Sequence, residues 1–374
     1  MQKKIYMVVN NDWFFLSHRS IVATRAKNAG YDVTIITRDN GFHDKIKSLG
    51  LKVVNLDINP MGMNIYEDLH TLKFLYKIYR SEKPDIVHHV GPKLNLWGSL
   101  AARMARVKGV VNAVSGLGVI FKTKGILGKL IPIAFRFTND IKNLIVIFQN
   151  IDDRNIYLKN NIVNNRQCRL IKGSGIDLNE FTYVPEPEDS IINIIFTGRM
   201  LKDKGILDIL ETARIMYPKY KGKIRFLLCG GLVEESRPNY VSAEQLNSLG
   251  DENYLSWLGK RDDIKELLEK SHIFIFPSFY GEGLPKSCIE ANAIGRPIVT
   301  TDSVGCRDTV RDGYNGYIVP IKDPVSLSQK LEILINNKNL RVQMGQNARM
   351  FAEENFSIEE VVNKHLEIYD ELLK

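Results

Sequence analysis

Residues 273–290 read IFIFPSFYGEGLPKSCIE, and this order predicts a strand, a glycine-rich loop and a helix. The apolar run Ile273–Phe276 is short and rich in β-branched and aromatic residues, which is typical of a buried strand. Pro285 suits the first turn of a helix, because the N–H that proline lacks has no partner there. Glu282 stands between two glycines in the loop, and Glu290 follows in the predicted helix. The stretch therefore predicts one strand-to-helix unit of a parallel sheet, with polar side chains at the carboxyl end of the strand.

The same alternation of short apolar runs and helical periodicity extends over all 374 residues, a length typical of two domains. Strands that alternate with helices indicate α/β sheets with parallel strands and right-handed crossovers. The strands expected in the first half are 4–9, 32–37, 52–56, 86–90, 110–114 and 144–148. Those expected in the second half are 191–196, 224–229, 254–257, 273–276, 297–300 and 316–319. Helices are expected at 17–29, 66–81, 206–216 and 358–373, with Ser17 as the N-cap of the first.

The two halves meet at the polar, proline-bearing stretch Val184–Glu188, which predicts a linker. We therefore expect an N-terminal Rossmann-like domain at 1–183 and a C-terminal one at 184–355. A last helix within 356–374 is expected to pack back on the first domain. Two doubly wound domains that face each other across a cleft bind ligands at the carboxyl ends of their strands. Because many activities share such folds, the function has to be argued from the site.

Charge is divided unevenly between the two halves. Residues 1–183 carry 27 Lys and Arg against 14 Asp and Glu, whereas residues 184–374 carry 24 against 29. The basic first half favours an anionic partner, such as nucleic acid, lipid phosphate or a membrane surface. No apolar run reaches about 18 residues, so no transmembrane helix is expected. Four scattered cysteines predict a reduced, cytoplasmic protein without structural zinc.

A second motif, FTGRMLKDKG at 196–205, also follows an apolar strand and leads into a helix. Arg199 and Lys204 would lie at the carboxyl edge of the sheet, where a guanidinium fork and an ammonium group can clamp a diphosphate. Ordinary surface basicity is the alternative for these cations, and it is the expected role of Lys202.

The carboxylates of Glu282 and Glu290 can accept hydrogen bonds from vicinal hydroxyl groups. The backbone amides of Gly283 and Leu284 precede the helix, where they can face an anion or sugar hydroxyls. The alternative is a surface loop with a solvated helix glutamate. The flanking glycines and the upstream strand favour a binding site.

Together the two motifs resemble glycosyltransferase family four, whose members share the GT-B architecture. The family's glycine–arginine and lysine–glycine signature stands at Gly198-Arg199 and Lys204-Gly205, and its E-x₇-E signature stands at Glu282 and Glu290. The resemblance implies that Arg199 and Lys204 stabilise the departing nucleotide diphosphate, that Glu290 binds the donor ribose and that Glu282 binds the transferred sugar. The remaining donor-binding residues that we expect are Gly198, Arg261, Gly283 and Leu284.

The resemblance also implies the chemistry. The expected donor is a UDP-sugar, a hexose or an N-acetylhexosamine is transferred with retention of configuration, and no further cofactor takes part. Arg, Lys and helix-end amides would neutralise the leaving group, so no metal is expected, and the chain has no Asp-x-Asp motif.

The first half resembles a narrower group within the family, the bacterial enzymes of surface-polysaccharide and lipid-linked oligosaccharide assembly. The resembling segments are FFLSHR at 14–19, DIVHH at 85–89, SGLG at 115–118, FQNIDD at 148–153 and GSGID at 173–177. The implied acceptor is a saccharide on a polyprenyl diphosphate, and the implied acceptor-side residues are Asn11, His18, His88 and Ser115. Many relatives have histidine where Ser115 stands. For His88 a packed, hydrogen-bonded ring is the alternative, and for His18 a capping role.

Residues 119–137 mix apolar residues with cations and could lie on a membrane without spanning it. The alternative is a helix buried between the domains, with its lysines extended to solvent. With the basic first half, this segment predicts a cytoplasmic protein docked peripherally on the inner face of the plasma membrane.

Three other functions are alternatives to a glycosyltransferase. A nicotinamide dehydrogenase would need G-x-G-x-x-G after the first strand, where the chain reads NNDWFF. A nucleic-acid binder would need interleaved basic and aromatic residues or a known module, and the chain shows neither. A non-hydrolysing UDP-sugar epimerase of the same architecture remains an alternative, although it has no use for a basic, apolar acceptor face.

Overall fold

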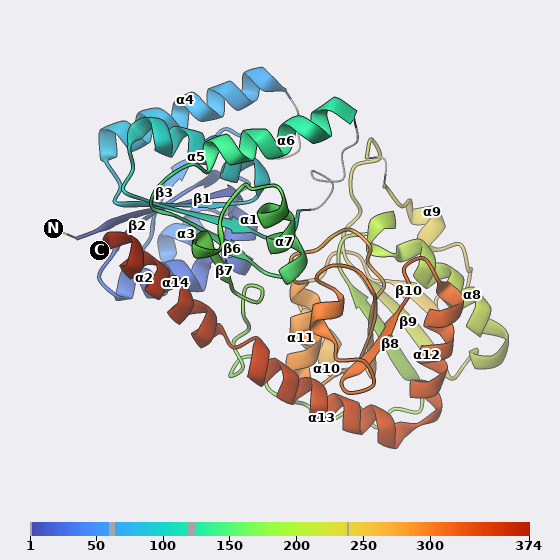
Figure 1. The fold of residues 1–374 in the computed structure, drawn as a ribbon. Coiled ribbons are helices and arrows are strands. Elements are labelled where there is room, and N and C mark those ends of the chain that lie inside the picture. The colour runs from blue at the N-terminus through green and yellow to red at the C-terminus, as the bar shows by residue number, and fades with distance from the viewer. Residues whose placement is uncertain (1, 60–63, 118–124, 238) are drawn as a thin grey trace. The chain divides into compact units, whose positions relative to one another are not determined.

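The computed structural model describes residues 2–59, 64–117, 125–237 and 239–374. The chain forms two compact units (Figure 1). Unit 1 comprises Met1–Ser174 and Glu359–Lys374, and unit 2 comprises Gly175–Ile358. Within the described residues, no helix is both long and apolar enough to cross a membrane.

The described part of unit 1 is built on a parallel seven-stranded sheet in the order β3-β2-β1-β4-β5-β6-β7. Its strands are β1 Lys4–Asn11, β2 Asp32–Arg38, β3 Lys52–Asn55, β4 Ile86–Val90, β5 Gly109–Val114, β6 Leu144–Phe148 and β7 Cys168–Leu170. Its helices are α1 Asp12–His18, α2 Ser20–Asn28, α3 His43–Ser48, α4 Ile65–Glu82, α5 Pro92–Ala105, α6 Gly125–Thr138, α7 Ile151–Lys159 and α14 Ile358–Leu373, with a 3-10 turn at Asn165–Gln167. Helices α4, α5 and α6 cover one face of the sheet, and α2, α3 and α14 cover the other (Figure 1).

The described part of unit 2 has a parallel six-stranded sheet in the order β10-β9-β8-β11-β12-β13. Its strands are β8 Ile192–Thr197, β9 Ile224–Cys229, β10 Leu255–Trp257, β11 Ile273–Phe276, β12 Ile298–Thr301 and β13 Gly316–Val319. Its helices are α8 Ile206–Tyr220, α9 Ala243–Leu246, α10 Ile264–Glu269, α11 Lys286–Ile294, α12 Pro324–Asn336 and α13 Lys338–Asn355, with 3-10 turns at Lys202–Lys204 and Arg307–Thr309. In both units the apolar strands are buried between helices, so two doubly wound Rossmann-like domains are confirmed.

The strands predicted from the sequence are confirmed, and the bounds of β4, β6, β9, β11 and β13 agree to the residue. Strand β7 was missed, because its three residues, Cys-Arg-Leu, have no apolar run or alternation that marks a strand.

The prediction of one helix at 17–29 with Ser17 as its N-cap is wrong. Helix α1 begins earlier, at Asp12, directly after β1, and Ser17 lies inside it. Arg19 leaves the helical region of the backbone, with φ −132° and ψ −11°, and α2 starts at Ser20. The cause of the early start is tertiary: the buried Asp12 carboxylate accepts hydrogen bonds from the Asn40 and Phe42 amides after β2.

The predicted linker at Val184–Glu188 packs within unit 2 rather than standing apart from it. The Val184 amide donates to the Ile294 carbonyl at 3.1 Å. The Glu186 carboxylate pairs at 2.9 Å with the Arg341 guanidinium, and both side chains are buried. Proline and charge alone do not distinguish a solvated linker from a polar segment that has buried ion-pair partners.

Helix α14 is attached to unit 1 by polar contacts as well as by its apolar face. The Glu359 carboxylate pairs with Arg25 of α2 at 2.5 Å, and Glu371 pairs with Arg169 of β7 at 2.7 Å. The Tyr369 hydroxyl lies 2.7 Å from His88 Nδ1 in β4. These contacts join the end of the chain to both α2 and the sheet.

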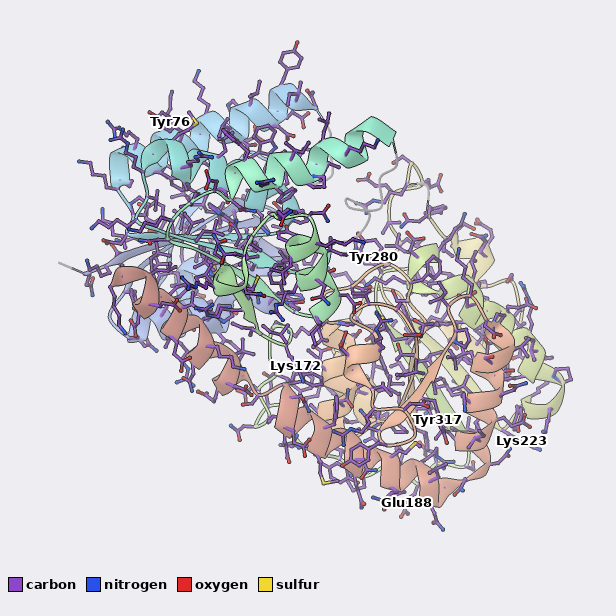
Figure 2. The ribbon with its side chains drawn as sticks, in the orientation of Figure 1. Tyr76, Lys172, Glu188, Lys223, Tyr280 and Tyr317 are labelled. Carbon is purple, nitrogen blue, oxygen red and sulfur yellow. The ribbon has the colours of Figure 1, made fainter. Side chains whose placement is uncertain are left out.

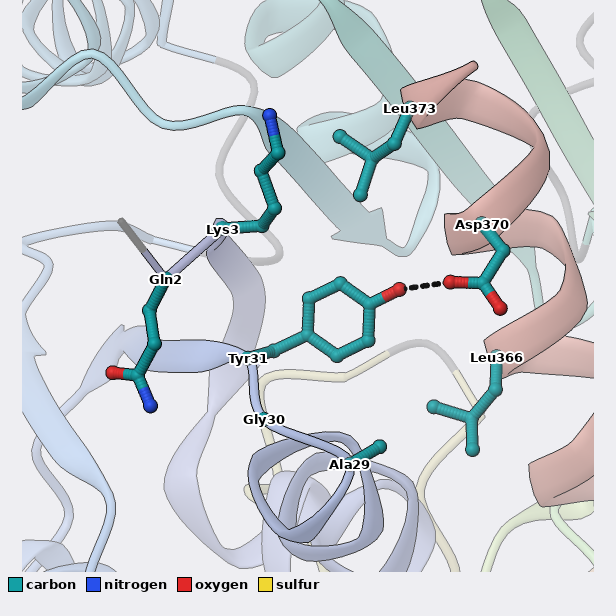
Figure 3. A pocket seen from close by; sticks show the side chains of 8 residues that line it. All are labelled: Gln2, Lys3, Ala29, Gly30, Tyr31, Leu366, Asp370 and Leu373. Carbon is teal, nitrogen blue, oxygen red and sulfur yellow. Dashed lines mark hydrogen bonds between the residues drawn. The ribbon is translucent and has the colours of Figure 1, made fainter.

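A shallow pocket of about 610 Å³ lies beside this helix, at the amino end of β1 (Figure 3). The Tyr31 hydroxyl bonds the Asp370 carboxylate across it, and Lys3 and Leu373 line it. Ligands of doubly wound sheets bind at the opposite, carboxyl edge, so this pocket is not the candidate site.

Candidate functional site

The two predicted donor motifs meet at the topological switch point of the unit 2 sheet. Strands β8 and β11 are far apart in the sequence but adjacent in the sheet, where Ile194 pairs with Ile273. The Arg199–Lys204 loop follows β8, and the loop containing Glu282 follows β11. Parallel strands end at one edge, so both loops emerge side by side where such sheets bind ligands.

Lys204 and Glu282 form an ion pair between these loops, and both side chains are nearly buried. The Ser278 hydroxyl lies 3.1 Å from the same Glu282 oxygen and 3.2 Å from the Asp203 carbonyl. The Lys204 ammonium also lies 5.1 Å from the centre of the Phe276 ring and 5.5 Å from that of Tyr280. Tyr280 is on the loop after β11 (Figure 2). Charge and aromatic faces thus hold the ammonium group in place before any ligand binds.

Glycine at two positions allows the loops to approach this closely. Gly205 has φ +78°, and a Cβ there would lie 2.2 Å from the Pro277 carbonyl oxygen. Gly305 has φ +79°, and a Cβ there would lie 2.3 Å from the Gly283 carbonyl oxygen. In both cases the obstacle is backbone, which a side chain could not displace without moving the loop.

Glu290 lies in the second turn of α11, and Pro285 is the N-cap of this helix rather than its first residue. Gly283 and Leu284 therefore precede the helix and are not part of its first turn. The Lys286 ammonium lies 3.7 Å from the Glu290 carboxylate. Burial raises the pKa of Glu290, and the neighbouring Lys286 partly opposes this shift.

The two predicted arginines of the donor site are both exposed but differ in their contacts. Arg199 follows Gly198 at the end of β8 and has no ion-pair partner among the described residues. Arg261, in the loop after β10, pairs with Asp263 at 2.5 Å. Strand β9 separates β10 from β8, so the structure brings Arg199, Lys204 and Glu282 to neighbouring strands and places Arg261 farther along the edge.

Of the predicted acceptor-side residues, Asn11 and His18 border the carboxyl edge of β1. Asn11 is half-buried at the end of the strand. The His18 ring, at the end of α1, stacks on Phe14 with the ring centres 4.1 Å apart, and its Nδ1 lies 2.5 Å from the Ser17 hydroxyl. Ser115 directly follows β5 and is half-buried.

His88 has to be corrected as an acceptor-side residue. It lies within β4 and its side chain is fully buried, so it offers no surface to an acceptor. Its ring packs 5.7 Å from the ring of His365 and bonds Tyr369, both on α14. The physical reason is that β4 is a central strand covered by helices on both faces, so a histidine inside the strand packs in the core.

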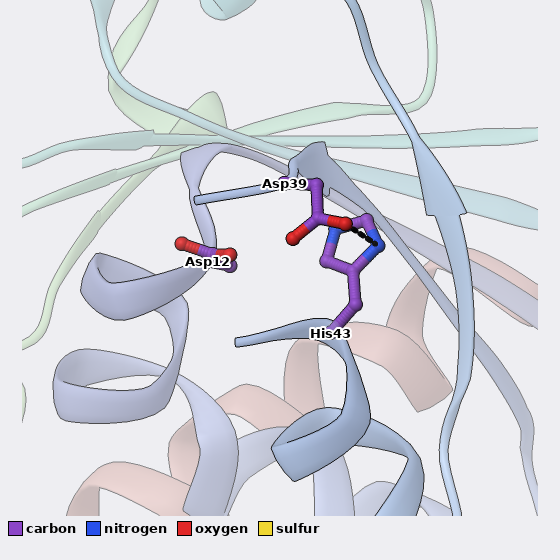
Figure 4. A group of neighbouring side chains, drawn as sticks. All are labelled: Asp12, Asp39 and His43. Carbon is purple, nitrogen blue, oxygen red and sulfur yellow. Dashed lines mark ion pairs between the residues drawn. The ribbon is translucent and has the colours of Figure 1, made fainter. Parts of the chain in front are cut away.

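Among the described residues, one group of side chains has metal-ligating chemistry: Asp12, Asp39 and His43, beside α1 (Figure 4). His43 Nδ1 lies 3.6 Å from the Asp39 carboxylate. The Asp12 oxygens already accept hydrogen bonds from Trp13, Asn40 and Phe42. These bonds hold the pKa of Asp12 below its usual value against the effect of burial, so its carboxylate is engaged in shaping the loop after β2.

Comparison with known families matches both halves of the chain. Residues 184–351 match the family described as glycosyl transferases group 1, and residues 4–148 match the glycosyl transferase 4-like family. The chain belongs to the family-four glycosyltransferases. The resemblance that the two motifs predicted is thereby confirmed.

Relatives of this glycosyltransferase align with nearly its whole length. It is 28% identical to the N,N'-diacetylbacillosaminyl-diphospho-undecaprenol alpha-1,3-N-acetylgalactosaminyltransferase of Campylobacter jejuni, over 96% of this chain and 98% of that one. It is 27% identical to the capsular polysaccharide biosynthesis glycosyltransferase CapM of Staphylococcus aureus, over 100% and 98%. HepE of Anabaena, crystallised with UDP, has the same fold, with a TM-score of 0.80 at 16% identity over 98% of this chain and 100% of that one. The GT-B architecture is confirmed.

Proposed function

We propose that this glycosyltransferase moves a hexose or N-acetylhexosamine from a UDP-sugar to a saccharide carried on a polyprenyl diphosphate, with retention of configuration. The observation that carries the proposal is the Lys204–Glu282 pair at the switch point of unit 2. It supports a donor site in which a cation meets the diphosphate and a carboxylate meets the transferred sugar. The name of the Campylobacter relative supports the lipid-linked acceptor, and the name of the Staphylococcus relative supports a role in polysaccharide assembly.

In this proposal the leaving diphosphate is neutralised by Arg199 and Lys204, and the transfer needs no metal. Both cations belong to the loop after β8, and Lys204 is already held in place by Glu282, so both can reach the same anion. Glu290 accepts hydrogen bonds from the ribose hydroxyls, and Gly198, Gly283 and Leu284 line the donor. Arg261 contacts the outer part of the nucleotide, because its loop is farther along the edge of the sheet.

A donor screen tests the function directly. UDP- and GDP-sugars are supplied with a lipid-diphosphate acceptor extract, and the anomeric configuration of the product is determined by NMR with and without EDTA. We expect a UDP-sugar to be used, an α-configured product from an α-configured donor, and most activity to survive EDTA. An inverted product, or activity restored only by manganese or magnesium, would contradict the proposed chemistry. Conversion of the UDP-sugar without any acceptor would indicate an epimerase.

The role of Glu290 makes a separate prediction. Glu290→Ala should weaken UDP affinity by about 1–3 kcal/mol, because buried ribose hydroxyls lose their acceptor. Calorimetric titration with free UDP measures the effect. Glu180→Gln is the matched control, since this exposed carboxylate lies close enough to influence the Glu290 pKa but has no proposed ribose contact. Equal UDP affinity of Glu290→Ala and wild type would rule out the ribose role.

We also propose that unit 1 docks on the inner face of the plasma membrane through α6. The inner face of this helix packs in the core of unit 1, where Phe135 contacts Tyr157. Its outward face is nevertheless apolar: Leu130, Ile133 and Phe137 are 51%, 62% and 58% exposed. Spacings of three and four residues place them on one stripe, flanked by the exposed cations Lys129 and Arg136. Residues 119–124 of the predicted segment, with Lys122 and Lys124, lie outside the described residues.

The stripe predicts salt-sensitive membrane binding. Ile133→Glu with Phe137→Glu should reduce co-sedimentation with anionic vesicles, because two inserted apolar side chains become charged. Ile333→Glu, on an equally apolar exposed position of α12, is the control and should bind vesicles like wild type. Binding of the wild type should weaken as salt rises, since a Debye length is about 8 Å at physiological ionic strength. Unchanged binding of the double variant would remove α6 as the docking surface.

A further inference from the structure

Lys204 belongs to the 3-10 turn Lys202–Lys204, which has little internal support. Within the turn, Lys204 N donates to the Leu201 carbonyl at 3.1 Å, and Gly205 N donates to the Lys202 carbonyl at 2.9 Å. The turn is three residues long, and no side chain caps its start. So few hydrogen bonds do not offset the cost of fixing the dihedral angles of a short segment. The position of Lys204 therefore depends on the segments that bond to the turn.

The segment after β9 supplies one set of such bonds. Lys202 N donates to the Asn239 carbonyl at 2.8 Å, and the preceding residue, Leu201, forms an antiparallel bridge with Tyr240. The side chain of Asn239 adds a further bond, because its Nδ2 donates to the Asp203 carboxylate at 3.1 Å. Asn239 thus holds the turn through both its backbone and its side chain, although 36 residues separate it from Asp203.

The loop after β11 holds the same turn by the main chain. The Asp203 carbonyl accepts from Phe279 N at 2.9 Å and lies 3.2 Å from the Ser278 hydroxyl. Asp203 is therefore bonded through its carboxylate to the segment after β9 and through its carbonyl to the loop after β11. Lys204 is the next residue, so these two attachments fix the point from which its side chain leaves the backbone.

We propose that Asn239, acting through Asp203, is a positioning residue that sets where the Lys204 ammonium meets the diphosphate of the donor. The inference rests on the proposed function, in which Lys204 stabilises the leaving diphosphate. The bond from Asn239 has a charged acceptor, which makes it stronger than a bond between neutral groups. A charge contact depends steeply on placement. Loosening the turn therefore weakens the contact with the diphosphate and leaves the contacts with the nucleoside unchanged.

The test compares the affinities of the full chain for UDP, by calorimetry, and for uridine, by saturation-transfer NMR, because uridine lacks the diphosphate. Asn239→Asp sets a second carboxylate against that of Asp203 and should weaken UDP binding about tenfold, with uridine affinity unchanged. Asn239→Ala removes the donor without adding charge and should weaken UDP binding by less. Asp203→Asn keeps an oxygen that accepts from Asn239 and should bind UDP like wild type. Combined with Asn239→Asp it exchanges donor and acceptor, which should restore UDP affinity.

A double-mutant cycle shows whether Asn239 acts through Lys204. In the Lys204→Ala background, Asn239→Asp should weaken UDP binding no further. Asn193→Asp is the matched control, because Asn193 Nδ2 also donates one bond, to the Lys270 carbonyl at 3.0 Å, but at the amino end of β8. It should bind both ligands like wild type.

The proposal is overturned if Asn239→Asp leaves UDP affinity unchanged or weakens uridine binding as much as UDP binding. It is also overturned if the donor–acceptor exchange restores nothing, or if the effect of Asn239→Asp is the same with and without Lys204. The proposed function fails by a different result, in which Lys204→Ala itself binds UDP like wild type.

Discussion

Lys204→Ala should lower kcat/KM for sugar transfer by about 2–4 kcal/mol of transition-state free energy, or roughly 30- to 1,000-fold. The ammonium group is already placed at the switch point by Glu282 and by the faces of Phe276 and Tyr280. In the proposed mechanism it would therefore meet the charge that develops on the leaving diphosphate without reorganising. Removing it also leaves the Glu282 carboxylate nearly buried without its cation, which adds to the loss. Arg199→Ala should lower kcat/KM by a similar factor, because the diphosphate loses its second cation.

The measurement is the rate of UDP release from the donor that the screen identifies. Lys202→Ala is the matched control, because Lys202 is in the same 3-10 turn and has the same charge. It should retain nearly the wild-type rate. Glu282→Ala should reduce turnover and sugar selectivity more than UDP affinity, since its proposed partner is the sugar. Rates within threefold of wild type for both Arg199→Ala and Lys204→Ala would disprove the diphosphate clamp.

Acid should destabilise unit 1 steeply, because three histidines are buried in neutral form. Burial lowers the pKa of His89 to about 4 and that of His365 to about 3, and burial with nearby His365 and Arg19 holds the pKa of His88 well below its usual value. As the pH falls below about 6.5, the unfolded chain takes up protons that the folded chain excludes. Each buried imidazole then lowers the free energy of unfolding by roughly 1 kcal/mol per pH unit. The three together approach a loss of about 3–4 kcal/mol per pH unit. The stabilising effect is fully present above pH 6.5 and is lost as the pH falls towards 4.

Urea unfolding between pH 7 and pH 5 measures this slope. His365→Gln should remove about one third of it, because one excluded proton disappears. His70→Gln is the control, since His70 is exposed on α4 and should leave the slope unchanged. A free energy of unfolding that stays constant from pH 7 to pH 5 in the wild type would show that these rings take up protons without unfolding the unit.

Apart from β7, the strands of both sheets could be predicted because their signals are local. Buried strands such as Ile273–Phe276 are continuous apolar runs, and the final helix has a clear apolar face, so neither depends on knowing its partner. The motif at 196–205 could be located for the same reason, since its glycines and cations stand in sequence beside a strand. The family resemblance then implied roles for Arg199, Lys204, Glu282 and Glu290, which remain predictions until the variants are measured.

The contacts that decide the sites are not local, and only the tertiary structure shows them. Lys204 and Glu282 are 78 residues apart, and they pair because β8 and β11 are neighbours in the sheet. The start of α1 depends on the backbone amides after β2. The packing of Val184–Glu188 depends on a partner in α13, and the burial of His88 depends on α14. By itself the sequence determined most strands and their order along the chain, because these follow from local periodicity. Pairing, burial and charge environment depend on which distant segments the sheets bring together.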